Sequence, residues 1–409
     1  MSEIPPVGRL LELGSCCCLA AAALAALLLV IQLLSLARHL RAPPPRSAVL
    51  PAISILKPLC GLDDDLATLL DDFALLDYSS YEVLLGVRTT ADAAWPVACE
   101  AARRHPGRLR VVVQGSEPGL NPKVNQLITL ARRARHDLLV VSDSNVSVGG
   151  AYLREIAAYL SDPTVGIVTH PIAGVGEQSL GALLDNVQMS AGTALGMVAA
   201  ARLAAKPIVV GKSMALRRED LLALGGFEAV KDVLAEDYVL GLLVTRRLGK
   251  RAVVARSPIF SVARHRNVGA FLARYRRWSV IHRHMVGIVP YLAEVLLYPC
   301  VLALMAFALA PCATTAAGLV AVATVRVMAD AACTRMLRPT PLPWFALLAG
   351  PLRELLLGAA WLEGLLRRSV VWRGNRLRVG KGTVLLAPGS GQSGGRHSLP
   401  APASLPDAA

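Results

Sequence analysis

The stretch D-L-L-V-V-S-D-S-N-V at residues 137–146 decides the fold that we expect. Its four consecutive apolar residues, 138–141, have the length and β-branched content of a strand that is buried on both faces of a parallel sheet. Asp143 and Asn145 follow this strand at the carboxyl edge of the sheet, where open α/β folds bind ligands. A carboxylate and an amide oxygen at this edge suit a Mg²⁺ or Mn²⁺ ion that shares a diphosphate. A turn capped by these side chains would explain the same residues equally well, so the choice between a metal site and a turn depends on the surrounding sequence.

The surrounding region, residues 51–282, has the pattern of an α/β domain. Apolar runs of strand length alternate with amphipathic stretches of helix length, which predicts a mainly parallel sheet with crossover helices. The expected strands are 53–56, 83–87, 109–113, 138–141 and 165–169, and the expected helices are 66–76, 95–104, 124–135 and 152–160.

Composition and charge indicate a membrane protein. Of the 409 residues, 54% are hydrophobic but only 5% are aromatic. Residues 16–37 can cross about 30 Å of hydrocarbon, so residues 1–40 are expected to form an N-terminal anchor. The net charge of +14 comes from basic residues beside the apolar segments, which favours a lipid surface and not nucleic acid as the partner. Basic residues directly after the anchor predict that the domain at residues 51–282 is cytoplasmic, at the inner membrane if the protein is bacterial.

The last third of the chain, residues 286–366, is expected to return to the membrane. Segments 288–310 and 313–333 each have spanning length, whereas 342–366 is interrupted by Gly350-Pro351 and is expected to form a re-entrant or interfacial hairpin. Arg326 and Asp330 are four residues apart, so a structural ion pair is expected. Residues 367–387 are expected to form a basic cytoplasmic segment, and residues 388–409 a disordered tail.

Two further polar sites follow expected strands. Asp92 comes just after strand 83–87, where its carboxylate could hold a base or a ribose, although a solvated loop residue would look the same. Lys123 lies in N-P-K-V-N at the start of a helix, where it could meet a phosphate group, although Pro122 with flanking amides is also an ordinary helix start.

Two more sites lie further along the chain. Glu236 and Asp237 precede an apolar helix, so they could serve only as helix-capping acids, or one could act as a general base toward an alcohol. Arg274 and Arg277 share a helix face with Trp278 nearby. This pattern suits a departing diphosphate, although arginines beside a membrane segment can also be simple flanking charges.

Taken together in this order, the motifs resemble those of the inverting family-2 glycosyltransferases with the D, D, D, (Q/R)xxRW pattern, and among them the ceramide glucosyltransferases. The resemblance covers residues 50–285 and, with the flanking membrane segments, nearly the whole chain. Its motifs are K-P-L-C-G-L-D at 57–63, Asp92, N-P-K-V-N at 121–125, S-D-S-N at 142–145, V-G-K-S-M-A-L-R-R at 210–218, A-E-D-Y at 235–238 and R-Y-R-R-W at 274–278.

The resemblance implies a GT-A fold and a role for each matching position. Asp92 would hold the uridine, while Lys123, Asp143 and Glu236 would bind the rest of the nucleotide sugar. Asp143 and Asn145 would hold the divalent metal, with Asn145 standing where a second acid is common. Asp237 would be the catalytic base. The remaining positions would hold the diphosphate and the acceptor end: Arg274, Arg277 and Trp278.

The activity implied is transfer of glucose from UDP-glucose to the primary hydroxyl of ceramide with inversion, which gives β-glucosylceramide. Another sugar or acceptor, such as N-acetylglucosamine on a hopanoid polyol, stays open as an alternative. A processive polysaccharide synthase shares the motifs, but this chain has few spans from which to build a polymer channel. A membrane transporter or binding module would explain the hydrophobicity but not the ordered acids.

Overall fold

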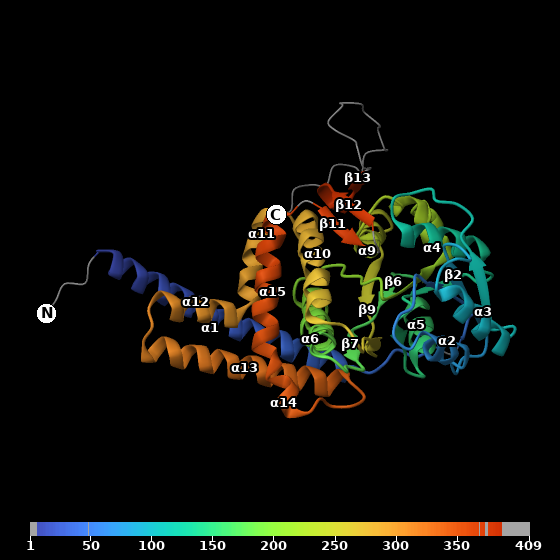
Figure 1. The fold of residues 1–409 in the computed structure, drawn as a ribbon. Helices are drawn as coiled ribbons and strands as arrows, with labels where there is room; N and C mark the ends of the chain where they lie inside the picture. Colours follow the sequence, from blue (N-terminus) through green and yellow to red (C-terminus); the bar gives the residue numbers. More distant parts are fainter. Residues whose placement is uncertain (1–5, 48, 368, 373–374, 387–409) are drawn as a thin grey trace.

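The computed structural model describes residues 6–386 apart from 48, 368 and 373–374. Figure 1 shows an α/β domain from which a bundle of long helices projects to one side. The tail expected at 388–409 lies outside the described residues.

The centre of the domain is a seven-stranded sheet in the order β3-β2-β1-β4-β8-β6-β9. All its neighbouring pairs are parallel except the two that involve β8. Every residue of β4 is buried, as expected for a strand covered on both faces. The strands are β1 Ile53–Pro58, β2 Tyr81–Val87, β3 Leu109–Val113, β4 Leu138–Ser142, β6 Val165–Thr169, β8 Ser213–Arg217 and β9 Arg251–Val254.

Helices cover both faces of this sheet because alternate strand residues point to opposite sides. On one face, Ile53 and Ile55 of β1 pack in one core with α2 (Leu66–Ala74), α3 (Ala94–Arg104) and α5 (Tyr152–Leu160). On the other face, Leu56 packs with α4 (Pro122–Arg133), α8 (Arg218–Ala223) and α9 (Glu236–Arg247). The expected mainly parallel α/β domain is therefore confirmed.

Two smaller sheets flank the central one. The first has the order β5-β10-β7, and its strand β7 is followed by a helix with a π-helical turn at Met189–Ala194. The second, β11-β12-β13, is antiparallel and is the last part of the chain that the structure describes. The bounds are β5 Val146–Ser147, β7 Ile172–Val175, β10 Ile259–Val262, β11 Ser369–Trp372, β12 Asn375–Val379, β13 Leu385–Leu386, α6 Leu180–Gln188 and α7 Leu195–Leu203.

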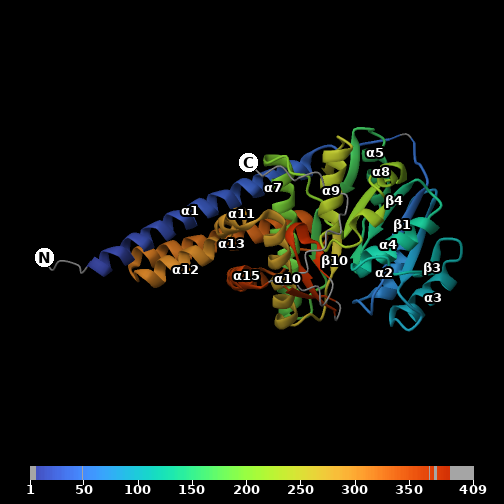
Figure 2. The same cartoon turned by 90° about the horizontal axis from the view of Figure 1, so that it is seen from above.

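The described residues contain three helices that are long and apolar enough to cross a membrane: 7–41 within α1, α13 and the pair α14–α15. Figures 1 and 2 show α1, α12 and α13 side by side in the projecting bundle, while α10 and α15 run across its base. The bounds are α1 Pro6–Arg41, α10 Val268–Val286, α11 Ile288–Ala293, α12 Pro299–Leu309, α13 Ala313–Leu337, α14 Trp344–Leu347 and α15 Ala349–Leu366.

The structure differs from the expected membrane region in two details. Segment 288–310 is not one continuous span, because it bends by 81° at the start of α12. Segment 342–366 contains no hairpin, because α15 continues through Gly350-Pro351 as one helix. Pro351 lies in the first helical turn, where a backbone N–H has no intrahelical partner in any case. Gly350 permits close helix packing, since a Cβ atom there would lie 2.5 Å from the Asp330 carboxylate.

Candidate active site

The candidate site begins where β1 and β4 end side by side. Lys57 in β1 is fully buried, and its ammonium donates to the Asp143 carbonyl oxygen at 2.8 Å and to Ser142 Oγ at 3.3 Å. Burial lowers the pKa of Lys57 to about 7, against the pull of the nearby Asp143 carboxylate. Lys57 thus fixes the backbone that carries Asp143.

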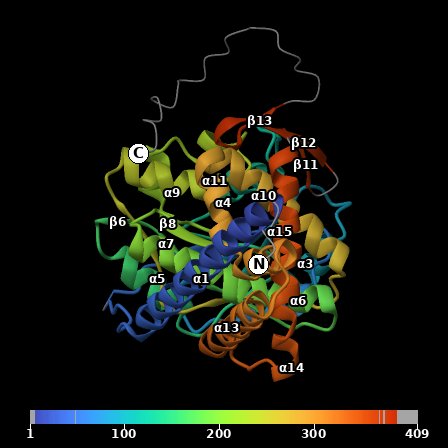
Figure 3. The same ribbon diagram turned by 90° about the vertical axis from the view of Figure 1, so that its left-hand side faces the viewer.

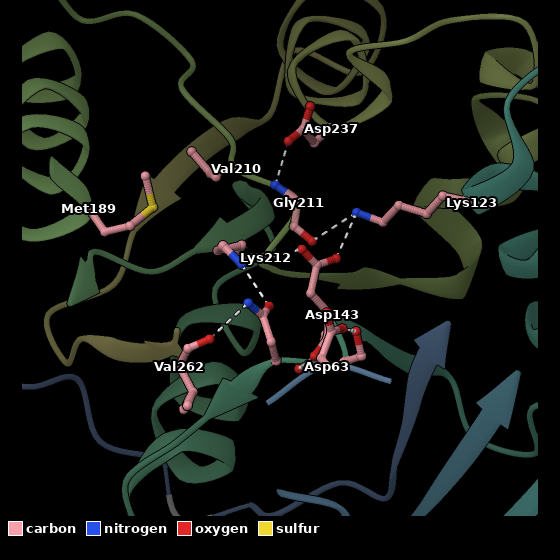
Figure 4. A network of polar contacts seen from close by, with 12 residues as sticks. Asp63, Lys123, Asp143, Met189, Val210, Gly211, Lys212, Asp237 and Val262 are labelled. Atoms are coloured by element: carbon pink, nitrogen blue, oxygen red, sulfur yellow. Dashed lines mark hydrogen bonds and ion pairs between the residues drawn. The ribbon is translucent and has the colours of Figure 1, made fainter. Parts of the chain in front are cut away.

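Lys123 joins acids from two distant parts of the chain. Asn121 caps α4 by accepting from the backbone N–H groups of Lys123 and Val124, which sets the course of the Lys123 side chain. Lys123 Nζ lies 3.0 Å from Asp143 Oδ1 and 3.1 Å from Glu236 Oε1. It also donates to the Gly211 carbonyl oxygen at 3.1 Å, as Figure 4 shows. The ends of β4, α4 and α9 therefore meet at one ammonium group.

The charges at this centre stabilise one another. Burial alone would lower the pKa of Lys123, but the carboxylates of Asp143, Glu236 and Asp237 outweigh it and raise the pKa. Burial would raise the pKa of Asp143, yet Lys123 and Lys212 lower it to about 2. Asp143 is therefore ionised and Lys123 is protonated throughout the physiological range.

Lys212 and Asn145 extend the site toward β10. Lys212 Nζ donates to Asn145 Oδ1 at 2.8 Å and lies 3.7 Å from Asp143 Oδ2. The Asn145 amide nitrogen donates to the Val262 carbonyl oxygen at 3.2 Å, which turns the amide oxygen toward Lys212. Burial lowers the pKa of Lys212 to about 8.

Glu236 and Asp237 are adjacent in sequence but differ in their surroundings. Glu236 is 4% exposed and is held by Lys123 and by the Asn121 amide at 3.4 Å. Asp237 is half-buried, and its carboxylate accepts hydrogen bonds from the backbone N–H groups of Gly211 and Tyr238. Burial raises the pKa of both carboxyl groups. Asp237 is thus the more accessible proton acceptor of the pair.

Gly211 is required where these groups converge. A Cβ atom at this position would lie 2.9 Å from both Asp237 Oδ2 and Lys123 Nζ, so a side chain would displace one of them. The absence of a side chain lets the backbone donate to the Asp237 carboxylate and accept from Lys123. Figure 4 shows Gly211 between Asp237 and Asp143.

Asp92 lies at the same sheet edge and reaches the other acids through a loop. Its carboxylate accepts from the backbone N–H groups of Gly61 and Ala94, each at 2.9 Å. Two residues after Gly61, the Asp63 carboxylate accepts a hydrogen bond from Ser144, next to Asp143. The structure therefore brings Lys123, Asp143, Glu236 and Asp237 into one cluster and leaves Asp92 beside it.

The motif with Arg274, Arg277 and Trp278 lies on α10. It is next to an acid for which the sequence predicted no role. Asp185 of α6 is 1% exposed and accepts from Arg266, from Arg274 at 3.2 Å and from Tyr275 at 2.9 Å. The Arg274 guanidinium also lies 5.7 Å from the Trp278 ring centroid. This acid positions Arg274, while Trp278 stays partly exposed on the helix.

Sequence reasoning assigned no role to several members of the site. Four of them lie within the motifs quoted above, but a place in a motif does not predict the contacts of a side chain: Lys57, Asp63, Gly211 and Lys212. Asp185 stands in the apolar helical stretch L-L-D-N-V. A lone acid in such a stretch must find a partner when it is buried, which is the signal that could have identified it.

The oxygen ligands here fit a hard divalent cation only in part. Within the described residues, no group of three or more His, Cys, Asp or Glu side chains could hold a metal ion. Asp143 and Asn145 supply a carboxylate and an amide oxygen, which suits Mg²⁺ or Mn²⁺ when a diphosphate and water complete the shell. The two side chains therefore fit a metal that arrives together with a nucleotide.

The fold and the charged sheet edge define the class as that of the GT-A glycosyltransferases. Among solved structures, the chain is similar to the mannosyltransferase PcManGT from Pyrobaculum calidifontis in complex with GDP-Man and Mn²⁺. The two are 22% identical with a TM-score of 0.51, and the match covers 86% of this chain and 99% of that one.

The chain belongs to Glycosyl transferase family 21, whose profile matches residues 17–385. It is 26% identical over 256 residues to ceramide glucosyltransferase 1 of Caenorhabditis elegans, a match that covers 60% of this chain and 52% of the relative. It is 28% identical over 232 residues to ceramide glucosyltransferase 3 of the same organism, a match that covers 56% of this chain and 50% of the relative. The chain thus spans about half the length of these relatives.

Proposed function

We propose that this chain transfers glucose from UDP-glucose to the primary hydroxyl of a ceramide-type lipid, with inversion at the anomeric carbon. The observation that carries the proposal is the meeting of Asp143, Lys123 and the Glu236-Asp237 pair at one sheet edge. It places cationic groups for a diphosphate next to a carboxylate that can accept a proton.

The donor is held by charges and by loop contacts. Asp92 holds the uridine end, while the ammonium groups of Lys123 and Lys212 face the diphosphate. A Mg²⁺ or Mn²⁺ ion on Asp143 and Asn145 would neutralise charge on the leaving diphosphate. Arg274, kept in place by Asp185, supplies a further positive charge, and Glu236 keeps Lys123 in position.

The reaction is a single displacement. Asp237 accepts the proton of the lipid hydroxyl, and the freed oxygen attacks the anomeric carbon from the face opposite the UDP. The bond from that carbon to the diphosphate oxygen breaks, and its electron pair leaves with UDP. An α-linked donor therefore gives a β-glycoside. Lys123 and the arginines stabilise the negative charge that develops on the leaving group.

The acceptor is supplied from the membrane side of the molecule. α10 carries Arg274 and Trp278 and packs along α15 at the base of the helical bundle (Figures 1 and 2). Trp278 is 36% exposed, so its ring is available to a lipid headgroup, and Arg277 lies next to it in the motif. We infer that the catalytic domain, residues 51–282, is cytoplasmic and works at the bilayer surface.

The experiment that tests this function is a matrix of donors and acceptors. Membranes containing the full chain are incubated with labelled UDP-glucose or UDP-N-acetylglucosamine and with ceramide, diacylglycerol or a hopanoid polyol. We expect label in a β-glucosylceramide that forms only with UDP-glucose and ceramide. Label exclusively in another lipid, or in a polymer, would refute the proposed substrates.

A further inference from the structure

We propose that a second site, separate from the nucleotide cluster, binds the headgroup of an anionic phospholipid. The site is a cavity of about 470 Å³ between the end of α10, the start of α11 and the C-terminal sheet, which is formed by β11, β12 and β13. Its side chains come from Arg283, His284, Ile288, Arg378, Lys381 and Leu386. None of these residues belongs to the cluster around Lys123.

The cavity is basic and contains no opposing acid. Its lining includes two arginines, a lysine and a histidine but no Asp or Glu. Arg283 is fixed by hydrogen bonds to the carbonyl oxygens of Leu365 and Arg367. The side chains of Arg378 and Lys381 are exposed and form no ion pair or hydrogen bond with any other residue that the structure describes. Two cations beside a third, fixed one suit a phosphate group.

An exposed apolar surface continues from the basic cavity. Ile288 lines the cavity and is 53% exposed, and the neighbouring Val289 and Leu292 are 74% and 45% exposed. Gly287, at φ +85°, ends α10 and lets α11 turn away from it. Acyl chains on α11 would bury this apolar surface while the headgroup contacts the cations.

The position of the cavity favours a lipid over a soluble phosphate. α11 packs against α10 on one side and continues into the turn Glu294–Leu297, which packs against α1 of the bundle. Figures 1 and 3 show α11 and the C-terminal sheet close together next to the helices of the bundle. A ligand with both a phosphate and acyl chains matches the two surfaces that meet here.

The test measures binding of dioctanoyl phosphatidylglycerol to the purified full chain in neutral detergent. In the variant Arg378→Glu/Lys381→Glu we expect affinity to fall at least tenfold, because two attractive charges become repulsive. The matched control is Arg246→Glu/Arg247→Glu at the exposed end of α9, which should bind as tightly as the unmodified chain. The milder Arg378→Gln/Lys381→Gln, together with thermal unfolding midpoints, separates loss of binding from loss of folding.

Parallel titrations identify the ligand chemistry. Dioctanoyl phosphatidylcholine and inorganic phosphate should each bind at least tenfold more weakly than phosphatidylglycerol, and excess UDP should not displace the lipid. Equal binding of phosphatidylcholine would overturn the preference for an anionic headgroup, and equal binding of phosphate would overturn the lipid. Unchanged affinity in a folded Arg378→Glu/Lys381→Glu variant, or displacement by UDP, would overturn the site itself.

Discussion

At the scale of residues, the surroundings of Asp237 change the pKa of the carboxyl group that we propose as the base. Burial raises its pKa, whereas Lys123 and the backbone N–H groups of Gly211 and Tyr238 act in the opposite direction. The net shift is upward, so the carboxylate is a stronger base than that of an exposed aspartate. Asp143, with its pKa lowered to about 2, remains a fixed negative charge.

The pH dependence of turnover should report this raised pKa. The base must be unprotonated to accept the hydroxyl proton, so kcat/KM should fall as the pH drops through the pKa of Asp237. The midpoint should lie above the ordinary aspartate value of about 3.9. The measurement is kcat/KM for the donor from pH 4 to pH 8, with protein stability checked at each value. A rate that stays flat down to the ordinary aspartate pKa would contradict the assignment.

At the scale of residues, the sequence predicted where the site residues lie in the fold better than it predicted which side chains they contact. Asp143 and Lys123 were predicted to lie near a diphosphate because one follows a buried strand and the other starts a helix. Their 3.0 Å ion pair could not be predicted, since it depends on how β4 and α4 meet in space. Asp185 was missed because its partners, Arg266 and Arg274, are about 80 to 90 residues away in the sequence.

At the scale of elements, the C-terminal sheet holds the segment that leads into Glu236 and Asp237. The backbone N–H of Leu234 donates to the Thr383 carbonyl oxygen at 2.9 Å. The backbone N–H of Leu385 donates to the Asp232 carbonyl oxygen at 2.7 Å. Thr383 is fully buried, and its hydroxyl accepts from Ala235 N–H at 3.3 Å. A segment near the end of the described chain thus positions the start of α9, which carries the proposed base Asp237.

Thr383→Val tests this contact with little change in shape. Ala235 N–H would lose its acceptor, and a buried donor without a partner costs about 1–3 kcal/mol. We expect kcat to fall roughly three- to tenfold while the KM for the donor stays unchanged. Thr245→Val in α9 is the matched control, because the Thr245 hydroxyl donates to the carbonyl oxygens of Gly241 and Leu242 in its own helix. Equal effects of the two substitutions on kcat would contradict a positioning role for Thr383.

The contact between α6 and α10 should depend on Asp185. Asp185→Asn removes a buried charge between Arg266 and Arg274, and such a loss costs about 3–5 kcal/mol. We expect a lower unfolding midpoint and a fall of at least about tenfold in kcat/KM, because Arg274 loses its partner. Tyr275→Phe removes only one hydrogen bond of the same acid, worth about 1 kcal/mol. A milder effect of Asp185→Asn than of Tyr275→Phe would show that the ion pairs do not organise α10.

Element boundaries were predictable where periodicity was strong and not where helices pack against one another. The sequence predicted five of the seven central strands from their apolar runs, and the structure has them: β1, β2, β3, β4 and β6. It did not predict β8, which pairs with β4, or β9 at the edge of the sheet. Gly350-Pro351 suggested a break, but the pair lies at the start of α15 and Gly350 packs against Asp330. Tertiary packing therefore decided where the chain bends.

At the scale of the whole molecule, an ionic cluster connects the bundle with the α/β domain. Arg326 and Asp330 form the expected ion pair within α13, and Asp330 also lies 3.1 Å from Arg353 of α15. Arg326 donates to the Ala191 carbonyl oxygen at 3.0 Å, in the π-helical turn after α6. One buried cluster thus ties α13 to α15 and to the helix that carries Asp185.

Asp330→Asn should weaken this connection throughout the molecule. Two buried arginines would lose a shared carboxylate, so we expect destabilisation by about 3–5 kcal/mol and a lower unfolding midpoint in detergent. Asp137→Asn, at a side chain that is 94% exposed, is the control and should leave the midpoint unchanged. An unfolding midpoint for Asp330→Asn equal to that of the control would show that the cluster does not stabilise the assembly.

The membrane helices and the α/β domain could both be predicted from hydrophobicity, but their relative placement could not. Spanning length depends on composition alone, whereas the crossing of α15 over the base of the bundle depends on contacts between residues far apart in the sequence.

The central claim is that Asp237 accepts the proton of a lipid hydroxyl beside a donor held by Lys123 and Asp143. The most direct measurement is turnover and UDP-glucose binding by the purified Asp237→Asn variant, with Glu228→Gln at an exposed ion pair as the control. The account predicts a fall in kcat of about 10²- to 10⁴-fold with donor affinity unchanged. Turnover close to that of the control, or loss of donor binding in a folded variant, would contradict it.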